Sequence, residues 1–147
     1  FMFYFNKKTL PLAHNIHFII DVGYYFAKIV FNMQSMENIK QDTTLYRLPQ
    51  IIHEYTNHSL SYFLIVYYMY NDKQKDYEFN DYSLIYTFIW VYTWLLFIYV
   101  PWVLITDDYI YSVLSPSKPI YIRLGMIFFM NILGYIANNV GKMLYSI

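Results

Sequence analysis

Long apolar runs without a formal charge dominate the second half of the chain. The first covers 25 residues, from Tyr82 to Thr106, and is framed by Asp81 and Asp107. An α-helix rises about 1.5 Å per residue and needs about 20 apolar residues to cross the roughly 30 Å hydrocarbon layer of a bilayer. Core helices of soluble proteins seldom stay free of charge for so long. The run therefore predicts a membrane-spanning helix, with Pro101 in its last turns, where a lost hydrogen bond costs least.

A second charge-free run covers 18 residues, from Leu124 to Gly141, between Arg123 and Lys142. Both cationic side chains are long enough to reach the membrane boundary, so this run also predicts a span. The connection at 107–123 contains Ser-Pro-Ser-Lys-Pro, which cannot be helical because each proline lacks an N–H donor and restricts its predecessor. Residues 82–147 are therefore predicted to form a transmembrane hairpin.

Residues 1–50 are predicted to contain an apolar helix, from Leu10 to Met33, followed by a polar linker. Seven positions share one face of this helix: Ile16, Ile19, Ile20, Gly23, Phe26, Ala27 and Val30. The pattern favours a helix lying in the membrane interface, or against partner subunits, over a further span. Asp21 is solvated in the flat arrangement that we favour. If the helix crosses the membrane, Asp21 is a costly buried charge and a functional candidate.

Residues 51–81 combine a short apolar run with a charged loop. The run from Tyr55 to Asn71 has 17 residues, the lower limit for a membrane span, and the sequence leaves its crossing open. The segment from Asn71 to Asp81 gathers acidic and basic residues and is predicted to lie in water. The predicted fold class is all-α: an integral membrane protein with a C-terminal transmembrane helical hairpin plus N-terminal interfacial or additional transmembrane helices.

Composition narrows the function classes. Only 14% of the residues are charged, against about 25% in soluble domains, which again favours a membrane protein. Ten basic residues balance ten acidic ones, so there is no net charge to attract nucleic acid, and no nucleic-acid partner is expected. The absence of cysteine excludes disulfides, thiolate metal sites and cysteine-ligated iron–sulfur clusters, and we expect no metal site.

Two groups of residues are candidates for specific roles. Gly134, Ala137 and Gly141 share one helix face with Asn138, and small residues and an amide on one face predict close helix packing. His14 and His17 are candidate cofactor-binding residues, because paired imidazoles can ligate a b-type haem within a helix bundle.

The two clear spans hold no titratable group that could relay protons, and no phosphate loop or hydrolase motif is present. We therefore predict no enzymatic activity of the chain itself.

The composition also points to a coding origin. Nineteen tyrosines, 12 phenylalanines and 7 methionines accompany only 4 glycines and 5 prolines, a skew toward A/T-rich codons that indicates an organelle genome. In this respect the chain resembles hydrophobic respiratory-complex subunits encoded by ciliate mitochondrial DNA. Residues 17–24, His-Phe-Ile-Ile-Asp-Val-Gly-Tyr, resemble a motif in the second helix of succinate dehydrogenase membrane anchor subunits. That family carries its haem-ligating histidine at the position of Leu10 in this chain.

The resemblance implies a noncatalytic, structural membrane-anchor subunit of a respiratory-chain complex in the mitochondrial inner membrane, multi-pass, with complex II slightly favoured. Its implied partners are other hydrophobic subunits of electron transport and the lipid bilayer. No cofactor is required, although the parent complex could hold haem b or quinone, and bound lipid such as cardiolipin is expected. The alternatives are a haem- or quinone-binding redox anchor, or a membrane subunit of cytochrome oxidase, complex I or ATP synthase.

Overall fold

The structure is a computed structural model, in which residues 9–30, 52, 56–72, 77–107 and 112–145 are described. Every regular element in these residues is helical, as the sequence predicts. In chain order they are α1 (Thr9–Val30), the π-helical turn η1 (Thr56–Leu60), α3 (Ser61–Asn71), α4 (Asp81–Trp94), the π-helical turn η2 (Leu95–Tyr99), α5 (Val100–Thr106), the 3₁₀ turn η3 (Ser112–Leu114) and α6 (Ile120–Tyr145). The polar linker predicted within 1–50 and the centre of the charged loop, 73–76, lie outside the described residues.

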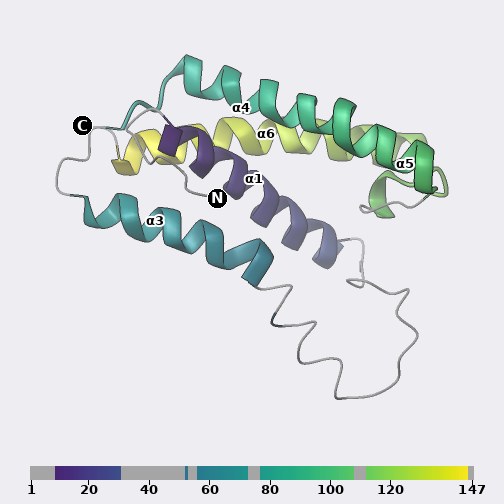
Figure 1. Ribbon diagram of the computed structural model, residues 1–147, viewed down its shortest axis with the longest axis horizontal. Helices are drawn as coiled ribbons and strands as arrows, with labels where there is room; N and C mark the ends of the chain where they lie inside the picture. The colour runs from purple at the N-terminus through teal and green to yellow at the C-terminus, as the bar shows by residue number, and fades with distance from the viewer. Residues whose placement is uncertain (1–8, 31–51, 53–55, 73–76, 108–111, 146–147) are drawn as a thin grey trace.

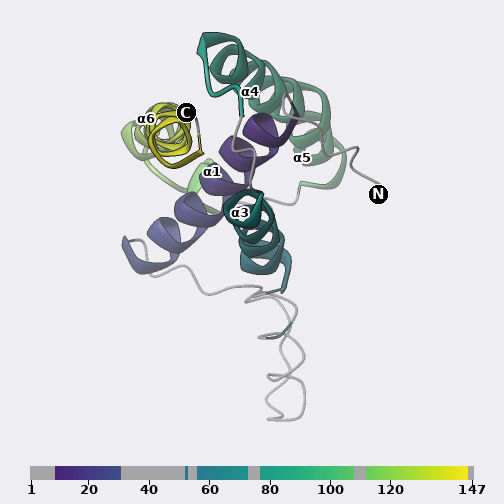
Figure 2. The same ribbon diagram turned by 90° about the vertical axis from the view of Figure 1, so that its left-hand side faces the viewer.

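Helix α1 is the central element of the bundle. In Figure 1, α4 and α6 lie along the long axis and α1 crosses beside them, with α3 on its other side. The end view in Figure 2 places α1 between α3 and the pair formed by α4 and α6, and α1 contacts all three. Its most extensive contact is with α6. The helix predicted from Leu10 to Met33 is therefore present over its described part as α1, and residues 31–33 lie outside the described residues.

The first charge-free run forms a continuous helical stretch from Asp81 to Thr106. It begins at a capping box, in which Asn80 Oδ1 accepts from the Ser83 N–H and Ser83 Oγ accepts from the Asn80 N–H, both at 3.0 Å. Pro101 has no N–H to donate to the preceding turn, and the helix widens to π geometry in η2 just before it. The stretch ends at Asp107, which adopts the left-handed conformation with φ 53°.

The second charge-free run lies within α6, which is longer than the run predicts. It begins directly after Pro119 and ends at Tyr145, so that Arg123 and Lys142 lie in its first and last turns. The Ser-Pro-Ser-Lys-Pro segment forms the predicted non-helical connection, in which the Lys118 N–H donates to the Ser115 carbonyl at 2.9 Å. Both the 81–106 stretch and α6 are long and apolar enough to cross a membrane.

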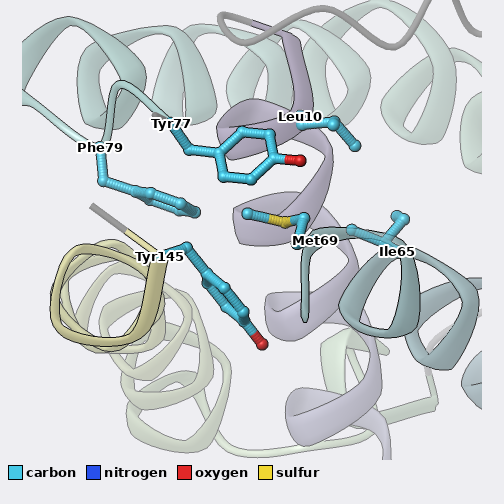
Figure 3. Close-up of a cluster of buried hydrophobic side chains, with 6 residues drawn as sticks. All are labelled: Leu10, Ile65, Met69, Tyr77, Phe79 and Tyr145. Carbon is cyan, nitrogen blue, oxygen red and sulfur yellow. The ribbon is translucent and has the colours of Figure 1, made fainter. Parts of the chain in front are cut away.

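Two apolar clusters close the ends of the bundle. One, shown in Figure 3, contains Leu10, Ile65, Met69, Tyr77, Phe79 and Tyr145. The other contains Ala27, Val113 and Met126.

Tyr77 and Phe79 are each only 3% exposed, so the prediction that the whole 71–81 segment lies in water is wrong for its two aromatic residues. Burial raises the pKa of the Tyr77 hydroxyl, which donates to Asp72 Oδ2 at 2.6 Å.

Candidate functional site

A buried amide joins three helices near the first cluster. Asn15 of α1 is 0% exposed, and its Nδ2 donates to Thr87 Oγ1 of α4 at 3.2 Å and to Asn138 Oδ1 of α6 at 3.0 Å. The Ser83 hydroxyl of α4 lies 2.7 Å from the same Asn138 oxygen. Because buried polar groups are costly without partners, these bonds favour one relative position of α1, α4 and α6.

The start of α4 takes part in the same set of hydrogen bonds. The Thr87 hydroxyl donates to the Ser83 carbonyl at 2.7 Å, and Asn138 Nδ2 donates to the Asn80 carbonyl at 3.4 Å. Asn80 and Ser83 are also the capping pair of α4. The helix cap and the contact between helices therefore share the same two residues, and a change at either position affects both.

His14 extends these bonds to α3. The ring is 0% exposed; Nδ1 lies 3.3 Å from Asn15 Oδ1, and Nε2 lies 3.2 Å from the Tyr62 hydroxyl. Since an amide oxygen only accepts, Nδ1 carries the proton, and Nε2 of the neutral ring accepts from Tyr62. We call the connected set the polar network: His14, Asn15, Tyr62, Asn80, Ser83, Thr87 and Asn138.

Aromatic rings enclose the imidazole of His14 within this network. The ring centroids of Phe18, Tyr62, Phe79 and Tyr145 lie 5.2 to 6.2 Å from its centroid. Coordination of a haem iron by either nitrogen would require displacement of the hydrogen-bonding partner and of some of these rings. The described geometry therefore assigns His14 a contact between helices, while haem binding stays a prediction that needs a rearranged site.

Asp21 is buried, and the expectation of a solvated Asp21 on a flat helix is wrong. Asp21 is only 6% exposed, because α3 packs against the side of α1 that faces away from α6. Its carboxylate interacts electrostatically with Tyr62 of α3. Asp21 Oδ1 and His17 Nδ1, one helical turn apart, are buried and lack hydrogen-bond partners.

Within the residues that the structure describes, no group of three or more His, Asp or Glu side chains could hold a metal ion.

The small residues of α6 lie on its buried side. Ala137 is 0% and Asn138 6% exposed. A Cβ on Gly134 would lie 2.7 Å from the Phe88 ring of α4, and one on Gly141 would collide with the Phe79 ring. The predicted stripe thus faces α1, α4 and the segment before α4. Its energetic role in packing remains a prediction, which substitutions at the glycines would test.

An apolar cavity of about 230 Å³ lies on the opposite side of α1 from His14. It is lined by α1, α4, η2, η3 and α6 and is partly open to the surface, with Ile19, Val91, Val113 and Ile127 among its lining residues. Tyr24 also lines it, whereas the neighbouring Tyr25 hydroxyl lies 2.7 Å from Ser59 Oγ beyond the cavity. His14 and His17 do not line the cavity, so the predicted cofactor-binding histidines and the main apolar space are separate features.

Sequence reasoning singled out Asn138 and His14 but missed their partners. Asn15, Tyr62, Ser83 and Thr87 complete the polar network. The available signal was an amide inside an apolar helix, since an isolated buried amide demands partners. Chemically, the network can hold helices together, because its members direct their hydrogen bonds at one another. Comparison of the chain with protein-family models, with curated proteins and with solved structures finds no match.

Proposed function

We propose that the protein is a noncatalytic structural subunit embedded in a membrane. The observation that carries this proposal is the exposure of the stretch from Asp81 to Thr106: only 6% of its most apolar 18-residue window is buried within the chain. The core helix of a soluble protein would be mostly buried. Exposed apolar side chains surround this stretch, including Ile85, Ile89, Leu96, Phe97, Ile98, Leu104 and Ile105. A continuous apolar surface of this kind requires lipid or other hydrophobic subunits around it.

The interior supports a scaffold role over a catalytic one. Helix α6 presents small residues and an amide to its neighbours, and the polar network links all four long helical segments of the described bundle. Tyrosines with apolar rings and polar tips are exposed on α3, α4 and α6, as at Tyr67, Tyr86 and Tyr135. Such side chains suit both the membrane interface and contacts between subunits.

The parent assembly that we propose is a respiratory-chain complex of the mitochondrial inner membrane. This step rests on the A/T-rich coding bias and on the likeness to mitochondrially encoded subunits. The likeness of residues 17–24 to succinate dehydrogenase anchors slightly favours complex II. In such a complex the chain would fill space between larger subunits and would order lipid at their boundary.

One pair of variants tests membrane embedding directly. Ile89 is 54% exposed near the middle of the proposed span, and Leu144 is 57% exposed at the end of α6. Lysine costs about 2.5 to 3.5 kcal/mol at the centre of a transmembrane helix and far less at its end. We therefore expect Ile89→Lys to impair membrane insertion and Leu144→Lys to be tolerated, measured as the fraction of chain that resists alkaline carbonate extraction. Equal behaviour of both variants, or release of the unmodified chain, would refute membrane embedding.

The subunit role is tested by extracting mitochondrial membranes in mild detergent, separating complexes on native gels and identifying peptides of this chain in each band by mass spectrometry. We expect comigration with one respiratory complex. A free small band would refute the subunit role, and comigration with a different membrane assembly would refute the respiratory assignment.

A further inference from the structure

The apolar cavity lies at the depth of the bilayer interior if the proposed membrane location holds. Its lining from α4 and the start of η2 falls between Phe88 and Leu95, near the middle of the Asp81–Thr106 stretch. The one amide in the lining, Asn131, is already used: Nδ2 donates to the Ile127 carbonyl at 2.8 Å, and Oδ1 accepts from the Tyr92 hydroxyl at 2.9 Å. The lining therefore favours a hydrocarbon chain over a polar ring. A dry apolar cavity of about 150 Å³ already admits benzene.

Two cations lie one helical turn beyond this cavity, at the η3 end of the bundle. On α6, Arg123 precedes the lining residues Met126 and Ile127 by one turn and lies on their side of the helix. Its Nε is buried and has no hydrogen-bond partner in the described chain. On α1, Lys28 follows the lining residue Tyr24 by one turn, with Nζ 5.8 Å from the ring centroid.

We propose that the cavity binds one acyl chain of an anionic phospholipid whose phosphate pairs with Arg123 and Lys28. The charge arrangement selects this occupant: two helices that line the apolar cavity each carry a cation one turn beyond it, at the end of the proposed spans, where a phospholipid places its phosphate. The Arg123 side chain as a whole is only half-buried, and a planar guanidinium is well suited to phosphate oxygens. The site would fix a lipid between α1 and the hairpin. The inference rests on the proposed membrane location, not on the identity of the parent complex.

The test is native mass spectrometry of the full chain, purified in mild detergent and exchanged into phosphatidylglycerol or phosphatidylcholine. We expect one retained phosphatidylglycerol and a lower occupancy by phosphatidylcholine. A basic residue near anionic lipid contributes about 1 kcal/mol, so Arg123→Gln should weaken phosphatidylglycerol retention about fivefold. The matched control is Lys142→Gln, an exposed cation at the other end of α6, which should change nothing.

A second pair of variants tests the cavity itself. Val91→Phe adds volume to the lining and should lower retention of both lipids, whereas Val100→Phe makes the same change at an exposed position beyond the cavity and should not. Circular dichroism confirms that each variant is folded, and Arg123→Gln tests the site without adding volume. Equal retention by Arg123→Gln and Lys142→Gln would overturn the proposal, as would a bound species with the mass of a quinone. Carbonate extraction of the same preparations separates a failed site from a failed membrane location.

Discussion

Replacement of Asn138 by alanine tests whether the polar network holds the bundle together. The change removes three contacts: the bond from Asn15 at 3.0 Å, the contact with the Ser83 hydroxyl at 2.7 Å and the bond to the Asn80 carbonyl at 3.4 Å. All three former partners keep other contacts, and the Asn80 carbonyl still accepts from the Leu84 N–H. Asn15 still donates to Thr87, and Ser83 still lies 2.7 Å from the Asn80 carbonyl. One N–H of Asn15 is left buried without an acceptor.

The expected loss follows from these contacts. A hydrogen bond between membrane helices contributes about 0.6 kcal/mol on average, so three bonds contribute about 2 kcal/mol. The space left by the amide at this 6% exposed position raises the total loss in free energy of unfolding to about 2 to 3 kcal/mol. Asn139, the next residue, is exposed. Asn139→Ala removes the same chemical group and should change the free energy of unfolding by less than about 0.5 kcal/mol.

The assay is equilibrium unfolding in mixed micelles, with sodium dodecyl sulfate added to a mild detergent and helicity followed by circular dichroism. A Ser83→Ala variant completes a double-mutant cycle with Asn138→Ala, in which we expect a coupling energy of about 0.5 to 1.5 kcal/mol. The reasoning fails if Asn138→Ala and Asn139→Ala lose the same free energy, because the network then contributes no more than an exposed amide does.

Three further perturbations probe other features. Gly141→Ala places a methyl group against the Phe79 ring and should lower the free energy of unfolding by about 1 to 3 kcal/mol. At Gly125 an added methyl group meets nothing within 4 Å, so Gly125→Ala should raise the free energy of unfolding by up to about 1 kcal/mol through helix propensity. Both are measured by mixed-micelle unfolding. Asp21→Asn removes a buried carboxylate with an unpaired oxygen and should raise the free energy of unfolding by about 1 to 3 kcal/mol near pH 8 in the same assay. Burial raises the pKa of Tyr77 above its ordinary 10.0, so folding favours the neutral phenol. The stability of the protein should therefore hold below pH 10 and fall above it. Tyr77→Phe should lessen this fall, measured by thermal unfolding at a series of pH values.

Each of these expectations has a clear contrary result. Equal effects of alanine at Gly141 and Gly125 would show that the α6 stripe is not a close contact. Destabilisation by Asp21→Asn would show that the carboxylate has a partner that stabilises it. An unchanged alkaline decline in Tyr77→Phe would show that other tyrosines account for it.

The charge-free runs predicted the long helices well because helix length and hydropathy are local properties. The run from Tyr82 to Thr106 differs from the observed helical stretch by one residue at its start. The run from Leu124 to Gly141 is too short at both ends, because Arg123 and Lys142 interrupt an apolar pattern without interrupting a helix. The π-helical turn at Leu95–Tyr99 has only an indirect signal in the sequence, the proline that follows it.

The site was less predictable because it depends on which helices meet. Asn15 and Asn138 are 123 positions apart, and neither periodicity nor spacing pairs them. The charged residues beside Tyr77 and Phe79 indicated a loop in water, but both rings are buried with Met69 and Tyr145 in the first cluster. His14 was recognisable as a polar group in an apolar helix, yet its hydrogen bond to Tyr62 could be found only from the packing of α1 against α3.

The central position of α1 has a consequence for biogenesis. This helix is synthesised before α3, α4 and α6, but it packs most extensively against α6, the last helix described along the chain. Until α6 has been made, Asn15 lacks its Asn138 acceptor and the apolar side of α1 lacks its main covering. If the proposed membrane location holds, we expect α1 to stay at the membrane surface or to be shielded by an insertion factor until α6 has been made. We expect chains that terminate before α6 to expose this unsatisfied helix and to be prone to aggregation and degradation.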